Sequence, residues 1–256
     1  MRAAFGASKG LLPPLILGVV TLLLWQAAVV VFEIKSFVLP SPSSIGEQFF
    51  TNLPTVWSNS LVTGMNSLIG LLIGMVLAVV FAIISALVRT IDELTAAVVS
   101  AAMVLPIVAL APVLYGMFSA SQQTARQLVA ALAVFVPVYV NTLKGLRQVR
   151  PVHRDLMRAH AASPWQATKV VTLPTALPFL FIGLRIASAL AVIAAVIAEY
   201  FGGPIGGLGK SITTAAAGSN YPLAWAYVLG SILLGLAFYL ATMGVEQLTL
   251  HRRGNG

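Results

Sequence analysis

The sequence contains no cysteine and few charged residues. The absence of cysteine from all 256 residues excludes disulfide bonds and thiolate metal sites. Charged residues make up 9% of the chain, against about 25% in an average soluble domain. Hydrophobic residues make up 59%, and the mean hydropathy is +0.95. This composition excludes an ordinary soluble domain and predicts a membrane protein.

The motifs of several enzyme and binding classes are also missing. His153, His160 and His251 lack the spacing of metal ligands, so we expect no metal site. No Gly-x-Ser-x-Gly or His-Glu-x-x-His occurs, and the apolar runs hold no pair of Asp or Glu residues. We therefore expect no catalytic residue. The net charge of +8 could indicate a nucleic-acid partner, but in membrane proteins basic residues usually mark cytoplasmic loops, so we expect none.

One short stretch resembles the end of a nucleotide-binding P-loop. The run "GPIGGLGKS" ends in Gly209-Lys210-Ser211, but the first glycine that the P-loop spacing requires is replaced by Pro204. The sequence therefore predicts no nucleotide site and no bound cofactor in this chain.

Six apolar runs are long enough to cross a membrane, which takes about 20 residues for roughly 30 Å of hydrocarbon. The first is longer than the apolar core of a signal peptide and no clear small-x-small cleavage site follows it, so we expect a retained helix. The sequence predicts an all-α membrane protein with six transmembrane helices in a single domain, residues 1–256. The runs are approximately 11–32, 60–88, 94–118, 125–143, 177–200 and 222–248.

The positions of the 15 lysines and arginines predict the orientation. Three of them, Lys35, Arg126 and Lys210, fall in the segments that lie outside if the N-terminus is inside, and Arg185 falls within the fifth run. We therefore expect both termini to be cytoplasmic and Lys210 to lie away from cytoplasmic ATP. The residues then expected in the cytoplasm are Arg2, Lys9, Arg89, Lys144, Arg147, Arg150, Arg154, Arg158, Lys169, Arg252 and Arg253.

The first outer segment, "LPSPSSIGEQFFTNLPTVW", carries a helix-start signal. Ser44 followed three residues later by Glu47 is typical of a capping box and predicts an interfacial helix. Phe49, Phe50 and Trp57 would lie at the level of the lipid headgroups.

Glycines and prolines predict how the spanning helices pack and bend. Gly70 and Gly74 form a Gly-x-x-x-Gly motif, which permits close approach of two helices. Pro106, Pro112 and Pro137 interrupt the third and fourth runs, and each tends to kink its helix. Kinked helices are common in transporters but also in membrane proteins that transport nothing.

The long polar segment of residues 144–176 separates the fourth and fifth runs. Arg147, Arg150, Arg154 and Arg158 fall at helical spacing on one face. Two interpretations stay open for this stripe. It is either a solvated face near the lipid headgroups or a docking face for an acidic partner.

A second short helix is predicted within the same segment. Ser163 is a good N-cap, Pro164 suits the first helical position, and Gln166 can complete a capping box. Ala161 and Ala162 then lie in a tight turn between two short helices. Such a projecting pair suits the groove of a partner protein.

The residues from Asp155 to Pro174, with "AASPWQATKVVTLPTALP" among them, resemble the cytoplasmic coupling loop of ABC importer permeases of the binding-protein-dependent type. The family signature is Glu-Ala-Ala, three residues, Gly, about nine residues, an aliphatic residue, one more, and Leu-Pro. Here Asp155-Leu156-Met157 stands in place of the triplet, Ala161 replaces the glycine, and Leu173-Pro174 is retained. Because alanine lacks the conformational freedom of glycine, we expect a turn that is less sharp or differently shaped.

A second stretch, "GLRIASALAVIAAVIAEYFGGPIGGLG", looks like the branch that serves nitrate, taurine, alkanesulfonates and pyrimidine precursors. In that branch an Ala-Glu pair ends the fifth span and Gly-Leu-Gly follows, as Ala198-Glu199 and Gly207-Leu208-Gly209 do here. Two interpretations of Glu199 stay open. It lies at an outer gate, pairing across a dimer or with a binding protein, or it is an interfacial carboxylate with ordinary hydration. We expect Arg185 to extend toward the cytoplasmic side.

The resemblance implies a type I ABC importer permease in a bacterial inner membrane. Its partners would be a second permease copy or homologue, two cytoplasmic ATPase subunits that bind ATP and magnesium, and an external solute-binding protein. The solute would be a sulfonate, nitrate, taurine, pyrimidine or flavin-like compound; a secondary transporter and a structural membrane subunit are the alternatives. The implied coupling residues are Asp155, His160, Ala161, Ala162, Ser163, Pro164, Trp165, Gln166 and Pro174, and the implied outer-gate residues are Glu199, Gly207 and Gly209.

Overall fold

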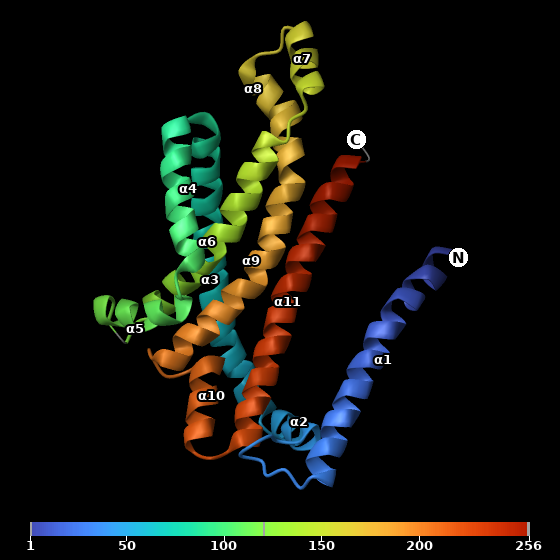
Figure 1. Cartoon of the computed structure of the whole chain (residues 1–256), viewed down its shortest axis with the longest axis vertical. Helices are drawn as coiled ribbons and strands as arrows, with labels where there is room; N and C mark the ends of the chain where they lie inside the picture. Colours follow the sequence, from blue (N-terminus) through green and yellow to red (C-terminus); the bar gives the residue numbers. More distant parts are fainter. Residues whose placement is uncertain (1, 120, 255–256) are drawn as a thin grey trace.

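The computed structural model describes residues 2–119 and 121–254, which form helices and no strand (Figure 1). The predicted all-α membrane fold is confirmed, with five helices long and apolar enough to cross a membrane, or six if one bent pair counts as a span. The side chains of Arg2, Lys9, His251, Arg252 and Arg253 lie outside the described ones. The five helices are α1 (Arg2–Val31), α3 (Leu53–Leu87), α6 (Thr124–Arg147), α9 (Leu173–Phe201) and α11 (Tyr221–Gly254).

The third predicted span is broken into two helices. α4 (Arg89–Val104) and α5 (Ile107–Met117) meet at an angle of 102°. The break falls at Leu105 and Pro106, because proline lacks an N–H and pushes the residue before it into an extended conformation. The sequence predicted a kink here, but α5 instead turns across the bundle (Figure 1).

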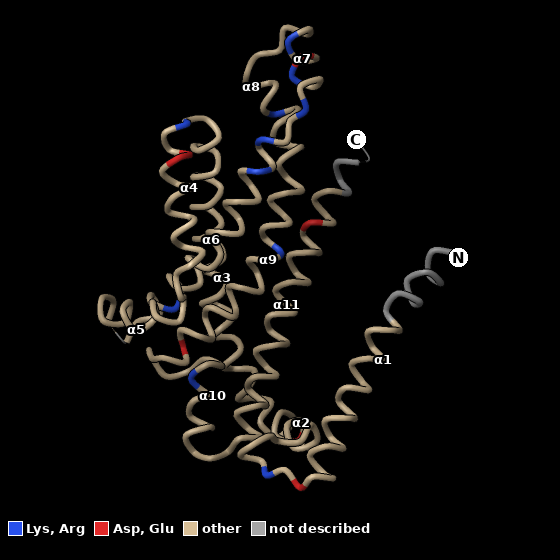
Figure 2. The backbone as a smooth tube through the Cα atoms, viewed as in Figure 1, with Lys and Arg blue, Asp and Glu red and all other residues tan. Residues whose placement is uncertain are grey.

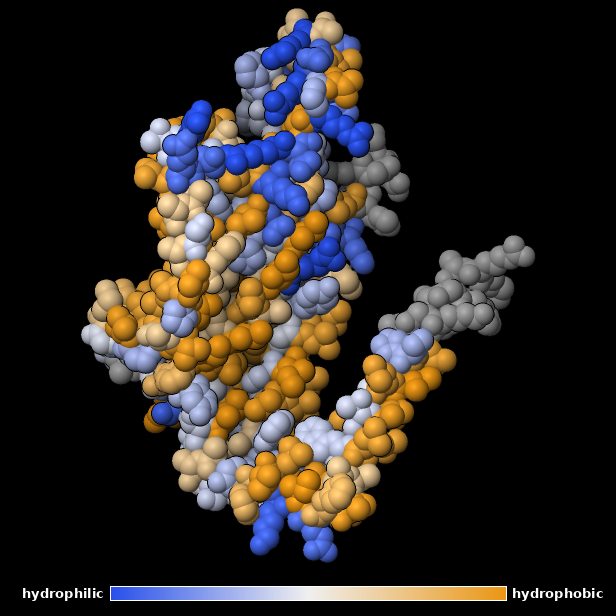
Figure 3. All heavy atoms as spheres, viewed as in Figure 1, coloured by the Kyte–Doolittle hydropathy of each residue, from blue (hydrophilic) through white to orange (hydrophobic). Residues whose placement is uncertain are grey.

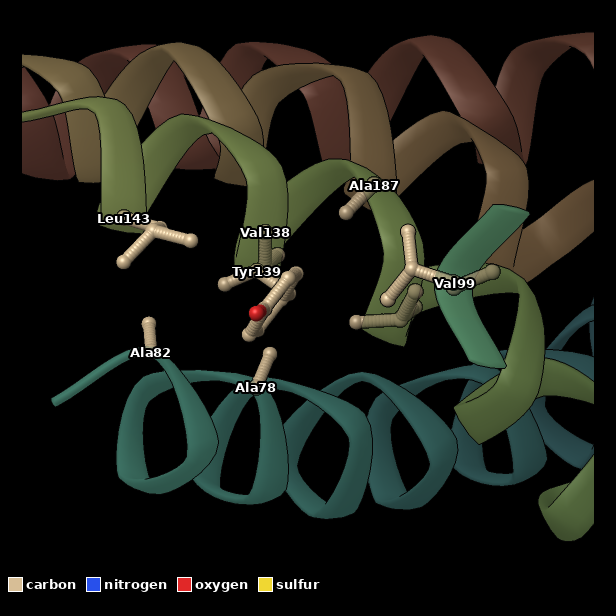
Figure 4. Close-up of a cluster of buried hydrophobic side chains, with 9 residues drawn as sticks. Ala78, Ala82, Val99, Val138, Tyr139, Leu143 and Ala187 are labelled. Atoms are coloured by element: carbon tan, nitrogen blue, oxygen red, sulfur yellow. The ribbon is translucent and has the colours of Figure 1, made fainter. Parts of the chain in front are cut away.

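Small residues hold the central helices α3, α6 and α9 together. A Cβ atom added to Gly74 would lie 2.5 Å from the Ala131 carbonyl oxygen on α6, so the Gly-x-x-x-Gly motif packs as predicted. Ala78 of α3 faces Tyr139 of α6, and Ala82 faces Leu143 (Figure 4). In lipid, where apolar burial adds little, such close contact is what stabilises helix pairs.

Two shorter helices, α2 (Pro42–Thr51) and α10 (Leu208–Ala217), lie at one end of the bundle (Figure 1). α2 forms where an interfacial helix is predicted, but its N-cap is Ser41, whose side chain accepts a hydrogen bond from the Ser44 N–H. The predicted cap at Ser44 is wrong because Pro42 already occupies the first helical position.

The opposite end carries α7 (Pro151–Ala159) and α8 (Pro164–Ala167), called here the knob, residues 151–167. A short π-helical segment, η1 (Thr168–Thr172), joins α8 to α9, so that the chain is helical from Pro164 to Phe201. Between the two ends the surface in view is mostly hydrophobic (Figure 3). That belt is the part of the molecule suited to lipid.

Candidate functional site

The knob begins its second helix with the predicted capping box. Ser163 Oγ accepts the Gln166 N–H at 3.3 Å, and the Ser163 N–H donates to Gln166 Oε1 at 2.7 Å. Pro164 occupies the first helical position, where its missing N–H leaves no hydrogen bond unmade. The cap fixes the direction in which α8 leaves the turn.

The turn between α7 and α8 keeps its sharp shape despite the alanine in place of glycine. Ala161 has a left-handed backbone, with φ of 47°. The Ala161 N–H donates to the Arg158 carbonyl at 2.9 Å, and the Ala162 N–H donates to the Met157 carbonyl at 3.0 Å. The expected loss of sharpness is therefore wrong. Ala161 adopts the left-handed conformation, which costs roughly 1–2 kcal/mol for a residue other than glycine.

No residue of α7, α8 or η1 is buried in the described chain. Trp165 is 70% exposed, and Val152, Leu156 and Val170 are exposed as well. A groove of about 380 Å³ lies between α7 and the start of α9 and is lined by residues that include Met157. Exposed apolar side chains beyond the hydrophobic belt are typical of a surface that a partner protein covers. The other predicted coupling residues lie nearby, with Asp155 and His160 on this knob and Pro174 in the first turn of α9.

The predicted arginine stripe does not share one helix face. Arg147 ends α6, whereas Arg150 is the N-cap of α7, because Pro151 starts a new helix. Arg147 Nη2 lies 2.7 Å from Asp92 Oδ2 on α4, so the first arginine is held by the bundle. Figure 2 shows lysines and arginines gathered at this end of the molecule.

A buried polar cluster lies at the opposite end, around Arg126 of α6. Arg126 is fully buried. Its guanidinium group donates to the carbonyl oxygens of Gly202, Pro204 and Gly206 at 3.3, 2.6 and 3.1 Å. These three carbonyls belong to the loop between α9 and α10. One arginine therefore supplies the hydrogen bonds that hold this loop against α6.

Glu199 of α9 forms the acidic side of the cluster and is also fully buried. Its Oε2 accepts from Thr63 Oγ1 at 2.8 Å and from the Gly209 N–H at 3.0 Å. Its Oε1 lies 3.9 Å from Arg126 Nη1. The carboxylate thus caps the N-terminus of α10, where exposed N–H groups and the helix dipole favour a negative charge.

Glycine is required where the loop enters α10. Gly207 has φ of +98°, and a Cβ atom added there would overlap the Glu199 carboxyl group. The Gly207 N–H donates to Asn59 Oδ1 at 2.9 Å, and the Leu208 N–H donates to Thr63 Oγ1 at 2.8 Å. Gly209 packs directly against the backbone of α9. The loop, α9 and α3 are thereby tied together.

Amide side chains extend the cluster between α3 and α6. Asn66 Nδ2 donates to Gln123 Oε1 at 2.9 Å, and Gln127 Nε2 donates to Asn66 Oδ1 at 3.3 Å. Arg126 Nε donates to the Tyr115 hydroxyl at 3.3 Å, and that hydroxyl donates to the Ala198 carbonyl at 3.1 Å. Bent helix α5, which carries Tyr115, is therefore joined to the same cluster.

The structure changes the interpretation of three charged residues. The interpretation of Glu199 as an interfacial carboxylate with ordinary hydration is wrong, because the side chain is enclosed and its partners lie within its own chain. Arg126 was expected in an outer segment, although its place in the first turn of an apolar run was a signal of burial. Arg185 has a partner that the sequence did not indicate, since its Nε lies 3.1 Å from Glu246 Oε2 on α11; its extension toward the cytoplasmic side stays a prediction.

Comparison with known proteins identifies related chains over most of this length. The family model described as "Binding-protein-dependent transport system inner membrane component" matches residues 70–250. The riboflavin transport system permease protein RibX of Chloroflexus aurantiacus is 36% identical, over 89% of this chain and 85% of its own. A probable ABC transporter permease protein of Haemophilus influenzae is 30% identical, over 90% of this chain and 94% of its own length. The formylaminopyrimidine transport permease protein ThiX of Halalkalibacterium halodurans is 26% identical, over 93% of this chain and 95% of its own length.

Proposed function

The chain belongs to the family of binding-protein-dependent transport system inner membrane components, and from this premise we propose that it forms the translocation pathway of an ATP-driven importer in a bacterial inner membrane. The pathway would lie between this chain and a second permease, either another copy or a homologue. The whole chain would act as one permease domain that hydrolyses nothing itself.

The observation that carries this proposal is the knob. Its capped turn holds Trp165 and Leu156 outside the hydrophobic belt with no described residue covering them. Two cytoplasmic ATPase subunits, which bind ATP and magnesium, would each cover one knob. Closure of the ATPases on nucleotide would then move α8 and the helix that continues from it.

The charge distribution supports the proposed orientation. Arg150, Arg154 and Arg158 belong to the knob end, which would be cytoplasmic together with both termini. The opposite end, with α2 and α10, would face the external solute-binding protein. Glu199, Gly207 and Gly209 would then form the outer gate, because they fix how the loop before α10 rests against α3 and α9.

A flavin- or pyrimidine-like solute is the first class to test, because the names of two relatives refer to riboflavin and formylaminopyrimidine. Sulfonates, taurine and nitrate form the second class. A thermal-shift screen of the partner binding protein against both sets would choose between them. A stabilising flavin or pyrimidine supports the first class, and a stabilising sulfonate or nitrate supports the second.

Co-purification with the ATPase tests the coupling surface. Trp165→Asp and Ala161→Arg should abolish recovery of the ATPase subunit with the tagged permease, and transport should fail with it. Ile205→Asp is the matched control for ATPase recovery, because Ile205 is also an exposed apolar residue but lies at the other end. Transport is not compared in this variant, because Ile205 belongs to the loop of the proposed outer gate. Normal assembly and transport in both knob variants would contradict the assignment.

Cysteine labelling tests the orientation without interference, since the chain has no cysteine of its own. An impermeant maleimide should label Ile205→Cys and Lys210→Cys in intact cells, and Trp165→Cys only after lysis. The reverse pattern would invert the proposed topology.

A further inference from the structure

A groove on the α3, α6 and α9 surface lies on the bundle side of the knob. Its volume is about 220 Å³, and Thr142 is its one hydroxyl-bearing residue. The apolar lining residues come from all three helices: Val79, Ile83, Leu146, Leu173, Ala176, Leu177 and Leu180. The groove thus lies toward the ends of α3 and α6 and at the beginning of α9, beside the basic end of the molecule.

The Thr142 hydroxyl has an unusual environment. Thr142 is 4% exposed, and its Oγ1 is the buried hydroxyl that lacks a hydrogen-bond partner among the described side chains. Hydroxyls in other helices of this chain donate to the carbonyl four residues earlier, as Ser67, Thr175 and Ser231 do at 2.7, 2.7 and 3.0 Å. A buried polar group left unpaired is costly, so this one calls for an acceptor supplied from the groove.

Positive charge lies just beyond the groove. Lys169 is exposed, precedes Leu173 by about one helical turn and forms no ion pair with the described residues. Arg147 follows Leu146 directly, and its side chain stays half exposed although it also binds Asp92. The groove therefore combines an apolar channel, one donor and a basic rim.

The basic rim, the Thr142 hydroxyl and the apolar channel follow one another in the same order as the phosphate, the ester carbonyl and the acyl chain of a phospholipid. With a rise of about 1.5 Å per residue, Thr142 lies roughly 7–8 Å below Arg147, and Leu180 roughly 10 Å below Leu173. An anionic phosphate would lie at the basic rim, an acyl-ester carbonyl would accept from Thr142, and the acyl chain would fill the channel. We propose that this groove binds one anionic glycerophospholipid.

Native mass spectrometry of the intact permease in detergent, titrated with phosphatidylglycerol or phosphatidylcholine, tests the site. Phosphatidylglycerol should bind as a single retained molecule. Thr142→Val keeps the shape of the side chain and removes the donor, so affinity should fall about two- to tenfold, the worth of one hydrogen bond. Ser231→Ala is the control, because Ser231 lines a different apolar groove between α9 and α11 and its hydroxyl is already paired.

Charge and shape are tested separately. Lys169→Gln should weaken phosphatidylglycerol about fivefold, as expected for one basic residue at a membrane surface. It should weaken phosphatidylcholine less, because choline offsets the charge of its phosphate. Lys210→Gln at the other end should change neither. Ile83→Trp should fill the groove and abolish retention, whereas Ile232→Trp in the other groove should not. Circular dichroism of each variant should match that of the unchanged protein, which serves as the check on folding.

Several results would overturn the proposal. These are unchanged binding in Thr142→Val and Ile83→Trp, equal affinity for the two lipids, or displacement of the lipid by excess inorganic phosphate alone. A disulfide-linked dimer of Leu177→Cys in membranes would show that a second copy, not a lipid, covers the groove. Because the readout is lipid binding, it is independent of transport and of the ATPase.

Discussion

Replacement of Arg126 by methionine should destabilise the protein by about 3–5 kcal/mol. That is the range for removing one partner of a buried ion pair and leaving the other charge uncompensated. Here the remaining charge is Glu199, whose side chain is fully enclosed. The loop carbonyls that Arg126 binds contribute less, because the exposed loop around Ile205 lets water replace the lost donor.

The measurement is thermal unfolding of the purified permease in detergent, followed by far-ultraviolet circular dichroism. By the scaling for chains of 150–250 residues, about 2–4 °C per kcal/mol, the midpoint should fall by roughly 6–20 °C. Arg89→Met is the matched control. Its side chain is 90% exposed and makes a single ion pair, with the exposed Glu93, so its midpoint should fall much less.

A double variant decides whether the buried charge is the cause. Glu199→Gln added to Arg126→Met removes that charge but keeps an oxygen that can accept from the Gly209 N–H. Part of the lost stability should return, because no uncompensated charge is then left buried. An Arg126→Met midpoint equal to that of Arg89→Met, or further loss in the double variant, would refute the reasoning.

Three other substitutions have defined outcomes. Ala161→Gly should stabilise the knob by about 0.5–1 kcal/mol, since relief of the left-handed strain exceeds the entropy that glycine adds to the unfolded chain, and amide hydrogen exchange in α7 and α8 should slow. Ser163→Ala should cost the knob about 1 kcal/mol through loss of the cap and speed the same exchange; unchanged exchange would contradict both. Gly74→Ala should lower the unfolding midpoint by an amount equivalent to about 1–3 kcal/mol, because its Cβ would meet the Ala131 carbonyl. Gly64→Ala, whose Cβ would lie 3.5 Å from Leu234, should be tolerated, and equal midpoints would refute the packing argument.

Local signals in the sequence were sufficient for several elements. Apolar runs of the right length predicted the spanning helices, and the Ser163–Gln166 pattern predicted the capping box of the knob. Gly70 and Gly74 predicted a close helix contact but not which helix would supply it. These features depend on residues within one or two helical turns, where chain connectivity already fixes the neighbours.

The polar cluster could not be predicted in the same way. Arg126, Glu199 and Thr63 lie on three different helices, and only the packing of those helices brings their side chains together. Pro106 signalled a disturbance, but a proline defines where a helix is interrupted, not the 102° through which the chain then turns. That angle follows from the docking of α5 through Ala111 and Tyr115.

The uninterrupted helical stretch from Pro164 to Phe201 makes the knob and the Arg126–Glu199 cluster two ends of one lever. Its 38 residues span about 57 Å. A tilt of one degree about either end would displace the other by about 1 Å, enough to break the hydrogen bond between Glu199 and the Gly209 N–H. The π-helical segment η1 lies near the knob end of this stretch. Its stiffness would therefore determine how much of a movement of α8 is transmitted along α9 to Glu199. In the proposed importer, a small movement of α8 would therefore be transmitted to the loop that Arg126 holds.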